Sequence, residues 1–223
     1  MDNAWQKCRG LEMKTDIPMD REEKKIYELE CIQELVEAGK GLVKTKAITD
    51  LGIDYRRILQ FVEEGSLTRV KSGYYTTKSG DYSEEQLIVA MYPDGILTLG
   101  SALYYHGYLK QRPFGWSIAI SKNTSKSRFK IEYPIVTPCY TEPEVMELGV
   151  TTVDVAGSEM KIYDKDRLIC DVLKYQEKLD RDDFREGVFA YIRDESKQVD
   201  KLMEYARERQ VLKKVQSMIG VWL

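Results

Sequence analysis

Arginine and glutamine side chains gather in one short stretch of this 223-residue chain. Arg56, Arg57 and Gln60 follow a helical spacing that points them away from the apolar side chains of Ile58 and Val62. In the major groove of DNA, arginine donates two hydrogen bonds to guanine and glutamine pairs with adenine. A recognition helix carries such side chains near its N-terminus. The sequence therefore predicts that this segment contacts base edges.

Further candidates for DNA contacts flank that helix. Lys44, Thr45 and Lys46 lie at the predicted start of the preceding helix, where main-chain amides and ammonium groups can bind phosphate. Arg69 and Lys71 flank a predicted hairpin tip, where they would meet the DNA backbone or the minor groove. The predicted DNA-binding residues are Lys44, Thr45, Lys46, Tyr55, Arg56, Arg57, Gln60, Arg69, Lys71 and Ser72.

Three helices are predicted to position these side chains. Asp20, with Glu23 three residues later, forms the pattern of a capping box, and an amphipathic helix with an acidic outer face follows it. Thr45 is predicted to cap a short second helix, and Gly52 allows the tight turn after it. Asp54 is the expected N-cap of the third helix, which carries the arginines.

A two-stranded hairpin is predicted to follow, with strands at 67–70 and 74–76 around a tip at 71–73. Helix, turn, helix and hairpin in this order predict a winged helix-turn-helix domain over residues 20–80. The alternative is that this domain binds another protein and that its arginines are merely solvated.

The charge distribution supports a polyanion partner better than the net charge of −3 does. Residues 40–78 hold eight basic and four acidic residues, and residues 95–131 hold six basic residues and no acid. By contrast, residues 20–37 hold seven acids against three bases, and residues 132–200 hold seventeen against nine. Polyanion binding depends on such local clusters rather than on the total charge.

The second basic segment is interleaved with the aromatic residues Phe114, Trp116 and Phe129. One hypothesis is a second polyanion surface, for DNA that flanks the first site or for a tRNA-like or nucleotide ligand. The alternative is a solvated strand face with loop lysines. The basic residues of this possible second surface are Lys110, Arg112, Lys122, Lys126, Arg128 and Lys130.

The rest of the chain predicts a mixed domain over residues 81–223, after an irregular arm at 1–19 and the domain at 20–80. Two helices are expected first, one capped by Ser83 and one starting at Thr98. Four strands follow, and Asp164 begins an all-helical tail. The strands are expected at 116–120, 129–137, 151–155 and 160–163. The predicted fold class is α+β: a winged helix-turn-helix, then a mixed α/β domain with a helical C-terminal tail.

Three short motifs, in this order, resemble the antitoxin of the AbiE abortive-infection system, the type IV toxin–antitoxin class. They are a hairpin ending in Gly-x-Tyr, a Ser-Ala-aromatic-His-Gly helix and an Asp-Arg-x-x-x-Asp helix. The resemblance covers roughly residues 40–195 and leaves out the arm at 1–19. The matching residues are Gly73, Tyr75, Ser101, Ala102, His106, Gly107, Asp166, Arg167 and Asp171.

The resemblance implies a double role. Such antitoxins bind inverted repeats upstream of their own operon and repress it. They also oppose a GTP-dependent nucleotidyltransferase toxin, typically without a stable complex. The winged helix is then expected to serve repression, and the C-terminal domain to counteract the toxin. One alternative is a transcription regulator whose C-terminal domain senses a ligand or mediates assembly, with no toxin partner. Another is a nucleic-acid enzyme with an unrecognised carboxylate site.

We expect no enzyme activity, no catalytic residue and no cofactor. His106 lies among tyrosines on an apolar helix, which favours a structural role. Asp164 and Asp166 lie at a helix start, where carboxylates cap amides, and Arg167 and Asp171 have the spacing of a pair on one helix face. These uses are favoured over a metal site.

The four cysteines are far apart and form no CxxC pair, so neither a zinc site nor a disulfide is expected; they are Cys8, Cys31, Cys139 and Cys170. No apolar run approaches the ~20 residues that cross a bilayer, and the N-terminus lacks the apolar core of a signal peptide. We therefore expect a cytoplasmic protein with no membrane partner.

Overall fold

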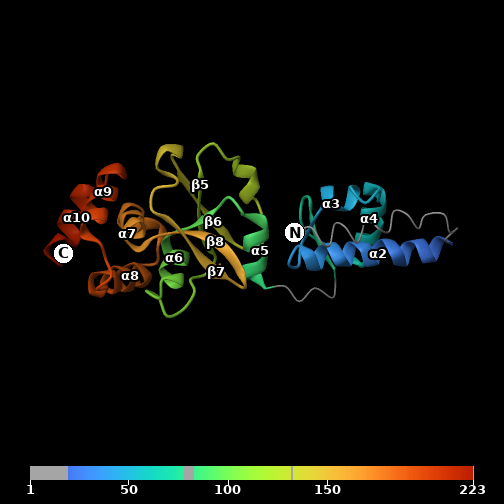
Figure 1. Cartoon of the computed structure of the whole chain (residues 1–223), viewed down its shortest axis with the longest axis horizontal. Helices are drawn as coiled ribbons and strands as arrows, with labels where there is room; N and C mark the ends of the chain where they lie inside the picture. The colour runs from blue at the N-terminus through green and yellow to red at the C-terminus, as the bar shows by residue number, and fades with distance from the viewer. Residues whose placement is uncertain (1–19, 78–82, 132, 223) are drawn as a thin grey trace. The chain divides into compact units, whose positions relative to one another are not determined.

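The structure is a computed structural model that describes residues 20–77, 83–131 and 133–222. The chain divides into two compact units between Met91 and Tyr92, and each is considered by itself. Figure 1 labels the helices and strands. The predicted arm at 1–19 and the predicted domain boundary at residue 80 lie outside the described residues. The chain is α+β, as predicted.

The first unit begins with the long helix α2 (Arg21–Ala38). The Asp20 carboxylate accepts hydrogen bonds from the backbone amides of Glu22 and Glu23, and the Glu23 carboxylate accepts one from the amide of Asp20. This reciprocal arrangement is the predicted capping box, which satisfies amides that a helix N-terminus leaves without partners.

Short helices and a three-stranded antiparallel sheet follow α2. Strand β3 lies between β1 and β2, so that Tyr75 has Val43 opposite it on one side and Arg69 on the other. Strand β1 has two residues, which is too short for a periodic pattern to reveal. The elements are β1 (Val43–Lys44), α3 (Thr45–Thr49), α4 (Tyr55–Glu63), β2 (Leu67–Lys71) and β3 (Tyr74–Thr77).

The caps of the two short helices differ. The Asp54 carboxylate accepts a hydrogen bond from the amide of Arg56 at 2.7 Å, which confirms Asp54 as the N-cap of α4. The prediction that Thr45 caps α3 is wrong, because Lys44 holds the N-cap position and no side chain caps the helix. Helix α3 starts directly from strand β1, and the amide of Thr45 donates to the carbonyl of Gly73 in the hairpin at 2.9 Å.

The core of the first unit lies between helices α2, α3 and α4 and the three-stranded sheet. Phe61 and Tyr75 are its largest members, and neither side chain is exposed. Apolar residues from each of these helices and strands surround them, as the amphipathic patterns predict. The buried core residues are Ile32, Val36, Val43, Ile48, Ile53, Ile58, Phe61, Leu67 and Tyr75.

Helix α5 (Glu84–Met91) closes the first unit and begins where the sequence predicts. The Ser83 hydroxyl accepts a hydrogen bond from the amide of Gln86, and the Gln86 side chain accepts one from the amide of Ser83. Three of its apolar residues, Leu87, Ile88 and Met91, are buried.

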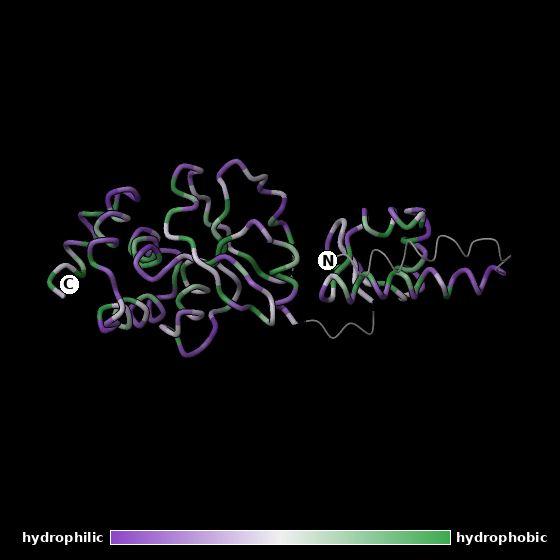
Figure 2. Tube along the Cα trace, viewed as in Figure 1, coloured by the Kyte–Doolittle hydropathy of each residue, from purple (hydrophilic) through white to green (hydrophobic). Residues whose placement is uncertain are grey.

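The second unit is built on a mixed five-stranded sheet of order β6-β5-β4-β8-β7. Strands β5 and β6 are parallel, as are β4 and β8, whereas β4 pairs antiparallel with β5 and β7 with β8. Figure 2 shows hydrophobic segments along these strands and hydrophilic loops around them. The strands are β4 (Ile96–Leu97), β5 (Trp116–Ser121), β6 (Val136–Thr141), β7 (Val150–Val155) and β8 (Ser158–Tyr163).

The strand predicted at 129–137 is wrong in its position. The 3₁₀ helix η2 (Lys126–Phe129) occupies its first residue, and β6 begins later and runs through Pro138. In a sequence, proline indicates the end of a strand because it has no backbone amide to donate a hydrogen bond. It is tolerated here because β6 is an edge strand of the sheet. The Phe129 ring stacks on Tyr92, with ring centroids 5.4 Å apart.

Five helices accompany the sheet, and α7 contacts the other four (Figure 1). Every residue of α7 from Asp166 to Leu173 is buried. A helix enclosed on all sides is normally apolar throughout, yet α7 carries Asp166, Arg167 and Asp171. The helices are α6 (Leu99–Tyr105), α7 (Lys165–Lys174), α8 (Arg181–Arg193), α9 (Val199–Glu208) and α10 (Leu212–Met218).

Candidate functional site

Most of the predicted DNA-binding side chains lie on the surface of the first unit. They come from the start of α3, the first turn of α4 and the β2–β3 hairpin. Thr45 and Lys71 are half-buried. The exposed members are Lys44, Lys46, Tyr55, Arg56, Arg69 and Ser72.

The start of α3 and the hairpin are joined by direct contacts. The Lys44 ammonium lies 5.7 Å from the centre of the Tyr74 ring, and the Arg69 guanidinium donates to the Ser72 hydroxyl at 3.3 Å. The backbone amide of Thr45 is already bonded to Gly73, so the prediction that this amide binds phosphate is wrong.

Arg57 and Gln60, which were predicted to bind DNA, have partners within the first unit. The Arg57 guanidinium donates to Glu28 on α2 at 2.7 Å and to the side-chain oxygen of Gln60 at 2.8 Å, and it lies 4.7 Å from the centre of the Phe61 ring. Gln60 in turn donates to Glu64. The sequence indicates only that the acids of α2 form an outer helix face, and it does not reveal that Glu28 pairs with Arg57. Arg56, beside Arg57, remains exposed.

The six basic residues of the second segment differ in their contacts. The Arg128 guanidinium binds the Asp94 carboxylate through two hydrogen bonds and lies 5.1 Å from the centre of the Tyr92 ring. Arg112 lies 4.7 Å from the centre of the Trp116 ring. These two arginines therefore have structural contacts. The hydrogen bonds from Arg128 hold the pKa of Asp94 below its usual range.

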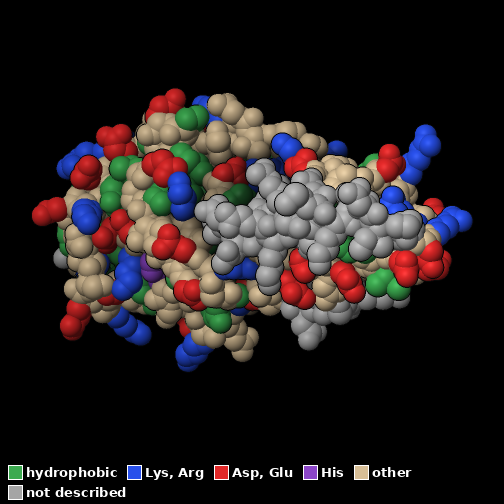
Figure 3. Space-filling view, turned by 45° about the vertical axis from the view of Figure 1, so that its right-hand side comes forward, with side chains coloured by type: hydrophobic (Ala, Val, Ile, Leu, Met, Phe, Trp, Pro, Cys, Tyr) green, Lys and Arg blue, Asp and Glu red, His purple; other side chains and the backbone are tan. Residues whose placement is uncertain are grey.

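The four lysines of that segment are exposed, and in the sequence they lie on both sides of strand β5. Lys110 precedes the strand, whereas Lys122, Lys126 and Lys130 follow it. Over the helical end of the second unit, Figure 3 shows acidic and basic side chains interspersed with hydrophobic ones.

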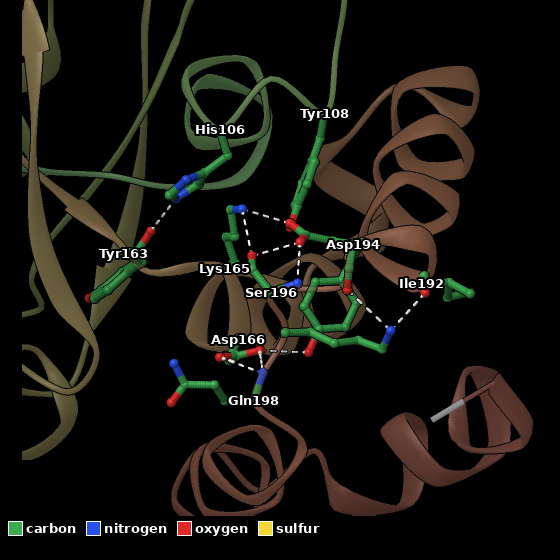
Figure 4. Close-up of polar contacts among 11 residues, drawn as sticks. His106, Tyr108, Tyr163, Lys165, Asp166, Ile192, Asp194, Ser196 and Gln198 are labelled. Carbon is green, nitrogen blue, oxygen red and sulfur yellow. Dashed lines mark hydrogen bonds and ion pairs between the residues drawn. The ribbon is translucent and has the colours of Figure 1, made fainter.

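A network of polar contacts joins α6, α7 and α8 in the second unit (Figure 4). His106 at the end of α6 lies with its Nε2 atom 2.7 Å from the carbonyl oxygen of Tyr163. A carbonyl only accepts, so Nε2 carries a hydrogen and donates it to this oxygen. Burial lowers the pKa of His106 below its usual value. These contacts match the structural role predicted for this histidine.

Asp194, directly after α8, is the centre of the same network. Its carboxylate accepts hydrogen bonds from the Tyr108 hydroxyl and the Lys165 ammonium, each at 2.6 Å, and from Ser196 (Figure 4). Burial acts to raise the pKa of Asp194, but the hydrogen bonds from Lys165, Ser196 and Tyr108 outweigh it and hold the pKa well below its usual range. The carboxylate is therefore ionised at neutral pH.

The carboxylates of α7 each have specific partners. Asp166 accepts a hydrogen bond from the Tyr191 hydroxyl of α8 at 2.8 Å and one from the amide of Gln198, the N-cap residue of α9 (Figure 4). Asp164 caps α7 through the amide of Arg167 and accepts from the Tyr205 hydroxyl of α9. The predicted capping role of Asp164 is confirmed. Asp166 instead joins two neighbouring helices.

Arg167, Asp171 and Arg209 form a buried ionic cluster. Asp171 pairs with Arg167 one turn earlier, as predicted, and also accepts two hydrogen bonds from Arg209 at 2.9 and 2.8 Å. Arg167 lies over the Tyr163 ring, 4.2 Å from its centre, in addition to its ion pair with Asp171. The contact of Arg209 with Asp171 was not predicted, because nothing in the sequence spacing links residue 209 to residue 171.

Burial raises the pKa of several hydroxyl and thiol groups in the second unit. Burial raises the pKa of Tyr163 to about 12 and that of Tyr205 to about 12. It also raises the pKa of the Cys139 thiol to about 11 and that of Cys170 to about 12. A thiol of such high pKa is a poor nucleophile.

Among residues 20–77, 83–131 and 133–222, no three His, Cys, Asp or Glu side chains converge to hold a metal ion. Within the same residues, no helix combines the length and the apolarity needed to cross a membrane.

The fold has a counterpart of known structure. The crystal structure of the Rv2827c protein from Mycobacterium tuberculosis matches with a TM-score of 0.57 over 82% of this chain and 76% of that chain. The two chains share 12% sequence identity, so the match concerns the fold alone. No family model and no curated protein matches the sequence.

Proposed function

We propose that residues 20–77 form a winged helix-turn-helix domain that binds duplex DNA. The observation that carries the proposal is the exposed Arg56 in the first turn of α4, beside a basic hairpin. The order helix, strand, helix, helix and hairpin, with strand β3 between β1 and β2, supports it. In such domains the third helix enters the major groove and its N-terminal residues contact base edges.

Arg56 is assigned to base recognition, and the side chains of Lys44, Lys46, Arg69 and Lys71 to the DNA backbone. This division follows from position, since Arg56 lies on the recognition helix and the others lie on flanking elements. Arg57 and Gln60 position α4 against α2 rather than touching DNA. Few cations remain for DNA, so we expect binding to depend on placed contacts rather than on a large positive field.

We further propose that the chain is the antitoxin of a type IV toxin–antitoxin system, which represses its own operon and opposes a nucleotidyltransferase toxin without a stable complex. The resemblance to AbiE antitoxins supports this. In the second unit the motif residues hold elements together: Ser101 accepts from the amide of Ser117 on β5, His106 contacts β8, and Asp166 contacts α8. Such a scaffold suits a protein that acts by binding rather than by catalysis.

Two readouts from one culture test the proposal. The full chain is expressed with the neighbouring nucleotidyltransferase-like gene and with a reporter under the upstream promoter of its own gene. The variant Arg56→Ala should release the reporter while still protecting growth. Conversely, a second-unit variant that keeps the fold should lose protection and keep repression.

The competing hypothesis, a regulator with no toxin partner, makes a different forecast. The reporter would again respond to Arg56→Ala, but no neighbouring gene would arrest growth in the absence of this chain. A binding assay that detects no affinity of the full chain for duplex DNA would contradict both hypotheses.

A further inference from the structure

The two edges of the five-stranded sheet in the second unit differ. The strand order places β6 at one edge and β7 at the other. An edge strand presents backbone amides and carbonyls that no neighbouring strand binds, and these groups can pair with a strand of another chain. Proteins commonly prevent this pairing with a proline or a lysine on the edge strand. Strand β6 contains such a proline, whereas β7 contains neither residue.

Pro138 blocks the outer side of β6. The amide of Trp116 on β5 donates to the carbonyl of Ile135, and the amide of Lys122 donates to the carbonyl of Thr141. Backbone groups of successive residues in a strand point to opposite sides, so the odd-numbered residues of β6 face β5. Pro138 therefore faces outward, where its ring replaces the amide that another strand would bind.

The outer side of β7 is open. The amide of Asp164 donates to the carbonyl of Gly149 at 2.7 Å, and the antiparallel register continues from there to the end of β7. The odd-numbered residues of β7 therefore bond to β8, while Val150, Thr152 and Asp154 turn their backbone groups away from the sheet. Thr152 and Asp154 are exposed, and their amides donate to no group within the part of the chain that the structure describes.

These open groups are complementary to themselves. In an antiparallel pair of two β7 strands centred on Thr152, the amide of each Thr152 meets the carbonyl of the other. The amide of each Asp154 meets the carbonyl of Val150 in the second copy. Both open amides are therefore satisfied in one register. Threonines opposite each other stabilise a sheet, and this register keeps the two Asp154 carboxylates apart, whereas one centred on Asp154 would oppose like charges.

We propose that β7 is a dimer interface, through which two copies of this chain join edge to edge about a two-fold axis. The result is one continuous sheet with five strands from each copy. A single short strand buries less area than the standard interface of about 1,600 Å², so the dimer is weak and forms as the protein concentration rises. The inference goes beyond the proposed DNA binding, and a two-fold dimer suits the inverted repeats of that proposal.

Sedimentation equilibrium of the full chain tests the interface. The average mass should rise with protein concentration from that of the monomer toward twice that value. Thr152→Pro removes an outward amide that the fold does not use, and Thr152→Lys places two ammonium groups opposite each other. Each variant should raise the dissociation constant of the dimer about tenfold or more and keep the urea midpoint of the parent. Thr137→Lys, on the blocked strand β6, is the matched control and should dimerise as the parent does.

Backbone NMR spectra of the parent identify the strand directly. The amide signals of Thr152 and Asp154 should shift as the protein concentration rises, because these amides gain hydrogen bonds, whereas that of Tyr140 on β6 should not. A chain that stays monomeric at every concentration would overturn the proposal. A dimer that forms without a shift at Thr152 and Asp154 would also overturn it. Neither result would bear on DNA binding, which titration of a duplex measures separately.

Discussion

The Nε2 atom of His106 lies 2.7 Å from the carbonyl oxygen of Tyr163, a contact between the end of helix α6 and the last residue of strand β8. The two residues are 57 positions apart in the sequence. The hydrogen bond requires a hydrogen on Nε2, and burial of the ring favours its neutral form. The packing of α6 is therefore linked to the protonation state of one residue.

His106 should titrate below the usual histidine range. Its pKa is lowered, mainly by burial, and an unfolded histidine has a pKa near ~6.5. The unfolded state thus takes up the proton first as the pH falls. The stability that depends on neutral His106 is therefore fully present above pH ~6.5 and lost as the pH falls through the lower folded-state pKa. His106 is the only histidine, so its ring proton is a unique NMR signal. A titration midpoint at or above the usual value would contradict this prediction.

Asp171→Ala should unfold the second unit far more easily than the parent. The substitution leaves Arg167 and Arg209 buried without their shared counter-ion, and loss of one partner from a buried ion pair costs about 3–5 kcal/mol. Urea denaturation measures the free energy of unfolding. Arg185→Ala removes an exposed pair with Asp182 and should change this free energy by less than ~0.5 kcal/mol. Equal effects of the two substitutions would show that the buried cluster is not a stabilising unit.

Arg56→Ala and Arg57→Ala should act on different properties. Arg56→Ala is expected to weaken binding to the preferred DNA sequence by about 1–3 kcal/mol and to leave stability unchanged. Arg57→Ala is expected to lower the free energy of unfolding by ~1 kcal/mol, because it breaks the ion pair with Glu28. DNA titrations and urea melts of both variants separate the two effects. If the Arg57→Ala protein were stable but had lost much of its sequence preference, Arg57 would be a residue that contacts DNA bases, as the sequence predicts.

Arg128→Ala should reduce stability rather than nucleic-acid affinity. The guanidinium holds Asp94 and lies over Tyr92, and the pair is partly exposed, so the expected cost is ~1 kcal/mol. Lys126→Ala, in the same 3₁₀ helix, should change neither property. Thermal unfolding and DNA titration check both variants. If both substitutions weakened nucleic-acid binding without loss of stability, residues 110–130 would after all form a second polyanion surface.

Local signals predicted the elements of the chain well where one physical cause dominates. The carboxylates of Asp20, Asp54 and Asp164 each cap a helix as predicted, because capping depends on neighbours within three residues. The alternating patterns also located β7 and β8. Strand β6 was misplaced because an edge strand accepts Pro138, and the position of a strand within its sheet is not a local property.

The candidate sites were harder to predict, because they depend on contacts between distant residues. Whether Arg57 faces a groove or a neighbouring helix is decided by Glu28, which lies 29 residues earlier. Similarly, Asp171 meets Arg209 across 38 residues, and Arg128 meets Asp94 across 34. Counting charges along the sequence treats these arginines as available for a polyanion, whereas in the structure each one is paired with a carboxylate.

Helix α7 is enclosed along eight consecutive residues, from Asp166 to Leu173, and α6, α8, α9 and α10 pack around it. Its amide hydrogens meet water only when several neighbouring helices separate together. In deuterium exchange these amides would therefore report the opening of the whole second unit, while the outer helices exchange through local fraying. Any partner that slows exchange in α7 must stabilise the unit as a whole, wherever on its surface that partner binds.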